Sequence, residues 1–208
     1  MTVISISEKP GAGSSTTAKL LAKKLGIKHF SPGRVFKDIG LGIVKKQYYY
    51  PLLKELCEEK KLEIPLLSAT NDSNAVTSFW KTPLGKSKEL HNILDELSNN
   101  LARKDNIVID GKLAVKLVKK SDLRVWLEAS LQIRAKRTSK RDSINQQTAE
   151  KLILEREEKE RKEWQKIYGF DYFNQKEEAD LIINTSKISP EQIVEKIIST
   201  LNIQTSRN

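Results

Sequence analysis

The sequence has little cysteine and no long apolar segment. Its 208 residues include a single cysteine, Cys57, which excludes a disulfide within the chain and a metal site built on paired cysteines. No apolar run approaches the roughly 20 residues that a membrane-spanning helix needs. Residues 1–7 lead directly into a strand pattern instead of a charged leader with a cleavage site. We therefore expect a cytoplasmic protein with no membrane partner.

The chain also lacks internal repeats and low-complexity linkers. A length of 208 residues suits one domain with a sizeable core and is short for two independent cores. Hydrophobic residues make up 38% of the chain and charged residues 31%, which is the balance of a folded protein and not of a disordered one. The sequence thus predicts a single domain over residues 1–208.

Acidic residues are fewer than basic ones: the chain has 27 acidic and 37 basic residues, and its formal charge is +10. Such an excess favours anionic partners, which include nucleotides, nucleic acids and acidic surfaces. The basic residues are interleaved with acids, and no motif of stacking aromatics appears, which argues against nucleic acid. Small phosphate-bearing molecules are the partners that we expect.

Strand patterns alternate with helix patterns along most of the chain. Strands are predicted at residues 2–7, 27–30, 106–110, 123–128 and 179–185, and helices at 15–25, 52–61, 84–103, 113–118, 131–141, 146–168 and 190–201. A further helix is predicted to begin at Pro32, and a polar loop is predicted around residues 71–74. This alternation predicts an α/β fold of three layers, with a five-stranded parallel sheet between two layers of helices. Ligands of such folds bind beyond the carboxyl ends of the strands, here after residues 7, 30 and 110.

A glycine-rich turn follows the first predicted strand and opens a helix. Consecutive backbone amides in this layout can wrap a phosphate at the positive end of the helix dipole. Compared with the usual phosphate-loop pattern, Glu8 replaces the first glycine and Ser14 replaces the lysine. The predicted phosphate-binding residues are Pro10, Gly11, Ala12, Gly13, Ser14, Ser15 and Thr16. The alternative is an ordinary tight turn between a strand and a helix. A loop that is flattened, or filled by the Glu8 carboxylate with no room for a triphosphate, would contradict the prediction.

Loss of the loop lysine removes a point charge that acts on the transferred phosphate, and such charges contribute strongly to rate. Lys9, near the start of the loop, could fold back over the phosphates and act as a catalytic cation. Its alternative is a solvated surface lysine. Both interpretations stay open at the level of sequence.

Six sequence blocks in the same order resemble the cytidylate kinases, a family of P-loop nucleoside monophosphate kinases, and especially their short archaeal-type members. The blocks are ISEKPGAGSSTTAKLLAKKLG, KHFSPGRVFKDI, NIVIDGKLA, DLRVWLEASLQIRAKRTSKRD, EREEKERKEWQKIYGFD and ADLIINTSKISPEQIVEKI. The resemblance implies ATP and Mg²⁺ as cofactors and CMP or dCMP as the acceptor. It also implies a helical acceptor-binding insert at about 31–105 and an arginine-rich lid at about 134–170.

Arginines at steps of three and four place Arg134, Arg137 and Arg141 on one helical face, and Arg156 follows on the next helix. Within the resemblance, Arg137, Arg141 and Arg156 are the catalytic lid residues that neutralise charge on the phosphates. The alternative is that these arginines pair with the neighbouring glutamates along solvated helices.

The resemblance also assigns metal and acceptor residues. Ser15 and Asp110 would hold Mg²⁺, although Asp110 could instead cap the segment after Gly111. The implied acceptor-binding residues are Ser31, Arg34, Lys37, Asp95 and Lys112. Lys37 and Lys112 replace arginines of the relatives, and Arg34 replaces an acid, so the base that is recognised stays open.

Two functional hypotheses follow from the sequence. The first is an ATP-dependent nucleoside monophosphate kinase acting on CMP or dCMP. The second is a weakly active or inactive nucleotide-binding relative that serves as a regulatory or interaction module, which the replacements at Glu8, Ser14 and Lys112 favour.

Overall fold

The computed structural model describes residues 1–87 and 89–205, so residue 88 of the predicted insert and residues 206–208 lie outside the described residues. The chain divides into two compact units. The first consists of Met1–His29 and Asn106–Asn208, and the second of Phe30–Asp105.

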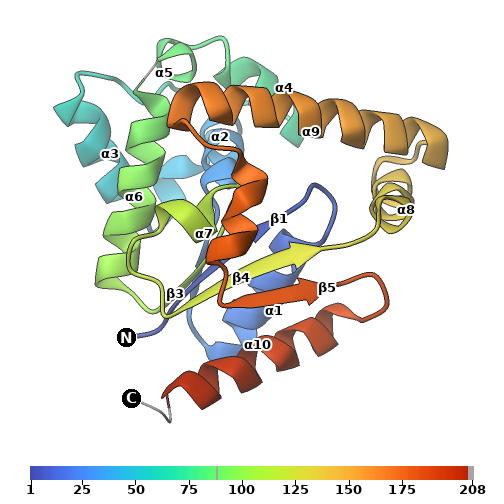
Figure 1. The fold of residues 1–208 in the computed structure, drawn as a ribbon. Helices are drawn as coiled ribbons and strands as arrows, with labels where there is room; N and C mark the ends of the chain where they lie inside the picture. The colour runs from blue at the N-terminus through green and yellow to red at the C-terminus, as the bar shows by residue number, and fades with distance from the viewer. Residues whose placement is uncertain (88, 206–208) are drawn as a thin grey trace. The chain divides into compact units, whose positions relative to one another are not determined.

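A parallel sheet forms the centre of the first unit. Its strands are β1 (Val3–Glu8), β2 (Lys28–Phe30), β3 (Ile107–Asp110), β4 (Leu123–Glu128) and β5 (Leu181–Asn184), in the order β2-β3-β1-β4-β5 (Figure 1). Ile4 of β1 lies opposite Val108 on one side and Leu123 on the other. The predicted five-stranded parallel sheet is confirmed, and its order brings the carboxyl ends of β1 and β3 side by side.

Helices cover both faces of this sheet. Helices α1 (Ser14–Leu25) and α10 (Pro190–Thr205) pack on one face, and α7 (Ala114–Leu117) with the 3₁₀ segment η2 (Tyr172–Glu178) packs on the other (Figure 1). The unit also contains α8 (Leu131–Asp142) and α9 (Gln146–Tyr168), which pack against each other. Val125 and Leu127 pack on the face covered by α1 and α10, whereas Trp126 between them packs against Tyr172 of η2 on the other face. None of the helices in the described ranges is long and apolar enough to cross a membrane.

The second unit is helical. It contains α2 (Pro32–Gly40), η1 (Val44–Lys46), α3 (Tyr50–Glu59), α4 (Asp72–Phe79), α5 (Pro83–Lys86) and α6 (Leu90–Lys104). The helix predicted over 84–103 is two helices, because the backbone of Ser87 is extended at the end of α5. The polar segment at 71–74, predicted as a loop, is instead the start of α4, where the Asn71 carboxamide accepts the amide hydrogen of Asn74.

Gly40, at the end of α2, allows α2 and α4 to touch through their backbones. A Cβ atom at Gly40 would lie 2.3 Å from the carbonyl oxygen of Ala75. Gly33, in the same helix, has no atom within 4 Å of such a Cβ. The close approach of α2 to α4 therefore requires glycine at position 40 and not at position 33.

We predict that Gly40→Ala lowers the free energy of unfolding by about 1–3 kcal/mol, because the backbone of α4 must shift. Gly33→Ala is the matched control and should be neutral or stabilising by up to about 1 kcal/mol, since alanine is the better helix former. Urea denaturation of both variants measures the difference. Equal stability of the two variants would contradict the contact.

Candidate functional site

The glycine-rich loop joins the end of β1 to the start of α1. Gly11 and Gly13 have φ angles of 86° and 107°, a left-handed conformation that favours glycine at both positions. The Ala12 amide donates to the Lys9 carbonyl over 3.0 Å and closes the first part of the loop. The amides of Gly13 and Ser14 then stand at the amino end of α1.

The Glu8 carboxylate is bound at these two amides. Its Oε2 atom accepts hydrogen bonds from the Gly13 amide at 2.5 Å and from the Ser14 amide at 2.7 Å. The positive end of the helix dipole stabilises a negative charge at this position. The loop is therefore an anion-binding cup, and the anion that it holds is a side chain of the same chain.

Two arginines of α8 bind the loop through its carbonyl groups. Arg134, which is buried, donates from Nη1 to the Pro10 carbonyl at 3.1 Å, and Arg137 donates to the Ala12 carbonyl at 3.1 Å. Arg137 also donates from Nη2 to the carbonyl of Thr185, at 2.7 Å. These contacts hold the loop conformation that presents the amides of Gly13 and Ser14.

The other predicted catalytic cations have partners of their own. Arg141 forms a two-pronged pair with Asp142, with both bonds at 2.7 Å, and Arg156 donates to Glu160 at 2.7 Å. The Lys9 ammonium lies over the ring of Phe173, 4.9 Å from its centroid. The structure thus places Lys9 beside η2, and its reach to bound phosphates stays a prediction.

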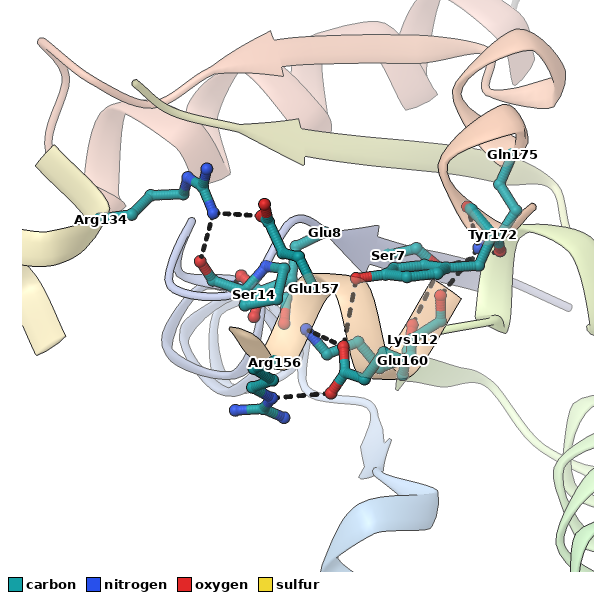
Figure 2. Close-up of polar contacts among 12 residues, drawn as sticks. Ser7, Glu8, Ser14, Lys112, Arg134, Arg156, Glu157, Glu160, Tyr172 and Gln175 are labelled. Atoms are coloured by element: carbon teal, nitrogen blue, oxygen red, sulfur yellow. Dashed lines mark hydrogen bonds and ion pairs between the residues drawn. The ribbon is translucent and has the colours of Figure 1, made fainter. Parts of the chain in front are cut away.

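Lys112 lies in the turn after β3, beside a cluster of charges. Its Nζ is 3.8 Å from Oε2 of Glu160, which also accepts a hydrogen bond from the Tyr172 hydroxyl at 3.1 Å (Figure 2). Burial lowers the pKa of Lys112, and the carboxylates of Glu8 and Glu160 oppose that shift by stabilising its charged form. Burial also raises the pKa of the Tyr172 hydroxyl, so it acts as a hydrogen-bond donor.

Three side chains form a hydrogen-bonded row at the ends of β3 and β2. Ser15 donates from Oγ to Asp110 Oδ2 at 2.8 Å, and His29 Nε2 lies 2.5 Å from Asp110 Oδ1. Hydroxyl and carboxylate oxygens are ligands that Mg²⁺ prefers, so the predicted pair fits this ion. No cluster of three or more His, Cys, Asp or Glu side chains suited to a metal occurs among the described residues, so the remaining ligands would be phosphate oxygens and water.

The predicted acceptor-binding residues other than Lys112 belong to the helical unit. Arg34 donates from Nε to the buried Asp38 at 2.8 Å, and Asp38 also accepts the Tyr49 hydroxyl at 2.6 Å. The bond to Asp38 fixes one edge of the Arg34 guanidinium, which is about half exposed. Ser31 precedes the first residue of α2 without a side-chain capping bond. Lys37 lies in the last turn of α2, and Asp95 in the middle of α6.

Sequence reasoning did not single out His29 or Gln175, and it offered Glu157 and Glu160 only as alternative partners of the arginines. His29 holds Asp110, Glu157 pairs with Arg134 at 2.5 Å, and Glu160 bridges Arg156 and Lys112. The Gln175 side chain, which is buried, donates to the Lys112 carbonyl at 2.8 Å. A glutamate repeat near the lid arginines was visible in the sequence, but it does not tell which acid meets which cation.

Comparison with known proteins identifies the family. A sequence profile of the cytidylate kinase-like family matches residues 3–187. The chain belongs to the cytidylate kinase-like family. It is 32% identical to a cytidylate kinase of Pyrococcus horikoshii over 195 residues, which cover 92% of this chain and 83% of the relative. It is 28% identical to a cytidylate kinase of Methanocaldococcus jannaschii over 204 residues, which cover 96% and 97%.

A solved structure supports the fold. Shikimate kinase from Bacteroides thetaiotaomicron matches with a TM-score of 0.53 over 97% of this chain and 98% of that chain, at 15% identity. The architecture of this cytidylate kinase-like chain is therefore that of the P-loop kinases, as predicted. At this identity the likeness concerns the fold alone.

We predict that Glu8→Ala has opposite effects on stability and anion binding. The variant should lose about 1 kcal/mol of unfolding free energy, since two amides at the start of α1 lose their charged acceptor. Pyrophosphate should bind about tenfold or more tightly, because it no longer competes with the carboxylate. Chemical denaturation and calorimetric titration measure the two effects.

The control is Glu177→Ala, which removes an exposed acid from the same unit. Equal gains in pyrophosphate affinity for both variants would mean that overall charge, and not the contact with the loop, is responsible.

Proposed function

We propose that this protein transfers the γ-phosphoryl group of Mg-ATP to a nucleoside monophosphate, with CMP or dCMP as the acceptor. One observation carries the proposal: two amides at the start of α1 already bind a carboxylate, in a loop that follows the first strand of a P-loop kinase fold. A phosphate oxygen carries the same kind of charge and accepts the same hydrogen bonds. Membership of the cytidylate kinase-like family supports the class of acceptor.

The proposed donor site is built from the loop at residues 10–16 and from the metal pair. The amides of Gly13 and Ser14 bind a phosphate once the Glu8 carboxylate has left them. Ser15 and Asp110 hold Mg²⁺, which when bound neutralises charge on the phosphates. Arg134 and Arg137 keep the loop in shape, because they bind its carbonyl groups.

The proposed lid cations are Arg141 and Arg156, with Arg137 fixed beside the loop. The side chains of Arg141 and Arg156 are 64% and 55% exposed and pair with acids on their own helices. The Arg141–Asp142 pair is exposed on both sides and contributes only about 0–1 kcal/mol, so a phosphate can replace Asp142 at little cost, whereas Glu160, the partner of Arg156, is only 15% exposed. Guanidinium groups that reach the phosphates would neutralise charge that develops during transfer.

The proposed acceptor residues of the helical unit are Ser31, Arg34, Lys37 and Asp95. Asp38 and Tyr49 hold the Arg34 guanidinium in one orientation, which suits a group that recognises a phosphate or a base carbonyl. The preference for CMP or dCMP rests on what the relatives are called, and not on a contact in this chain.

A second candidate function is a nucleotide-binding protein without significant turnover. The Glu8 carboxylate favours it, because it occupies the amides that a phosphate would use. Ser14, which carries no charge at the position of the usual loop lysine, also favours this second function.

A coupled phosphotransfer assay with CMP, dCMP, UMP and AMP, in excess Mg-ATP, separates the two functions. The kinase proposal expects turnover with CMP or dCMP well above that with AMP. Binding of ATP without turnover on any of the four acceptors would establish the second function instead.

We predict that Arg156→Met lowers kcat by tenfold or more, roughly the effect of losing one group that stabilises transition-state charge. Lys162→Met is the matched control, because Lys162 also forms an ion pair with an acid four residues away on α9. Steady-state kinetics with CMP measures both variants. If the two variants lose the same activity, Arg156 has only a structural role.

A further inference from the structure

The phosphate loop lacks its own cation. Ser14 stands where the phosphate-loop pattern has lysine, and its side chain is buried and uncharged. Lysine at that position reaches the β- and γ-phosphates as a point charge. A nucleotide in this loop would need that charge from another residue.

Lys112 lies in a turn whose backbone is held firmly. Gln175 donates to the Lys112 carbonyl at 2.8 Å, and the Ser7 hydroxyl donates to the carbonyl of Gly111 at 2.9 Å. Both partners are buried. The lysine side chain is only 21% exposed, so its stem has little freedom. The position of the ammonium group is therefore set by the residues packed around Lys112.

The Lys112 ammonium lies beside Glu160 and is influenced by the charge of Glu8. Its distance of 3.8 Å to Glu160 is longer than a hydrogen bond, and Glu160 also accepts bonds from Arg156 and Tyr172 (Figure 2). Among nearby acids, Glu8 contributes most to keeping the lysine charged, ahead of Glu160, against the lowering of its pKa by burial. The carboxylate that fills the cup is thus also the anion that most strongly stabilises this ammonium.

Other cations around the loop are engaged elsewhere. Arg134 and Arg137 bind loop carbonyls, and the Lys9 ammonium lies over an aromatic ring. The carbonyl contacts hold the two guanidinium groups to the loop backbone. Arg141 and Arg156, the proposed lid cations, are largely exposed and would reach the phosphates only after leaving their own acids. Lys112, with a side chain only 21% exposed, is the cation held in place that remains for an anion at the amides of Gly13 and Ser14.

We propose that Lys112 supplies the donor phosphates with the positive charge that Ser14 does not provide. An oxygen of the polyphosphate that replaces the Glu8 carboxylate would meet the two loop amides and the Lys112 ammonium together. This inference rests on the proposed function, and it assigns Lys112 to the donor phosphates instead of the acceptor monophosphate. Lys112 is then a binding residue that compensates for the altered loop.

A rescue experiment tests this assignment. Isothermal calorimetry measures binding of inorganic tripolyphosphate to the full chain, which needs neither turnover nor an acceptor. We expect Lys112→Met to weaken binding by tenfold or more, and Ser14→Lys combined with Lys112→Met to restore most of the loss. Ser14→Lys alone should bring no gain, because a second ammonium in the same site is repelled.

Lys116→Met is the matched control, since Lys116 lies four residues further along and pairs with Glu178. Its affinity for tripolyphosphate should equal that of the unaltered chain. Circular dichroism checks that each variant is folded, and Lys112→Gln replaces the methionine variant if the latter is not.

Three results would overturn the inference. They are unchanged tripolyphosphate affinity in the Lys112 variant, failure of Ser14→Lys to rescue it, and no binding to the unaltered chain. If the Lys112 variant instead shows only a raised KM for CMP, the lysine serves the acceptor. Tripolyphosphate binding with the expected rescue but no turnover would support the inference while rejecting the kinase proposal.

Discussion

The hydrogen bonds from the Gly13 and Ser14 amides to the Glu8 carboxylate determine what this site can bind. They show that the loop has the conformation of an anion-binding cup, since a flattened turn would not direct two successive amides at one oxygen. A nucleotide that binds at these amides, as the proposed function requires, must exchange with a side chain and not simply with water. Under that proposal, binding of phosphate is coupled to movement of Glu8 and to the charges that face it.

Ion pairs around the loop differ in how readily they exchange. Arg134 and Glu157 are 5% and 12% exposed, and breaking such a buried pair costs about 3–5 kcal/mol. The Arg134–Glu157 pair is therefore part of the structure that holds the loop. The pair of Arg141 with Asp142 is largely exposed and contributes little to stability, so Arg141 can change partners. The fold therefore separates cations that hold the loop from cations that are available to a ligand.

Local pattern was enough to predict the sheet and the loop, because strand alternation and the left-handed turns at Gly11 and Gly13 depend on neighbouring residues. It failed at α4, where a polar segment at 71–74 begins a helix. The pairs that organise the site were also missed, since His29 meets Asp110 across 81 residues and Arg134 meets Glu157 across 23. Side-chain pairing over such separations leaves no periodic signal. Occupation of the loop by Glu8 was foreseen as an outcome that counts against phosphate binding, and the structure shows the Glu8 carboxylate at the Gly13 and Ser14 amides.

The central claim is that donor phosphates displace Glu8 from the loop amides. Nuclear magnetic resonance of the labelled protein tests it directly, through the amide signals of Gly13 and Ser14 and the carboxyl carbon of Glu8 during titration with ADP. The account predicts that all three signals shift together and saturate at the same ADP concentration. Saturating ADP binding that leaves the three signals unmoved would contradict it.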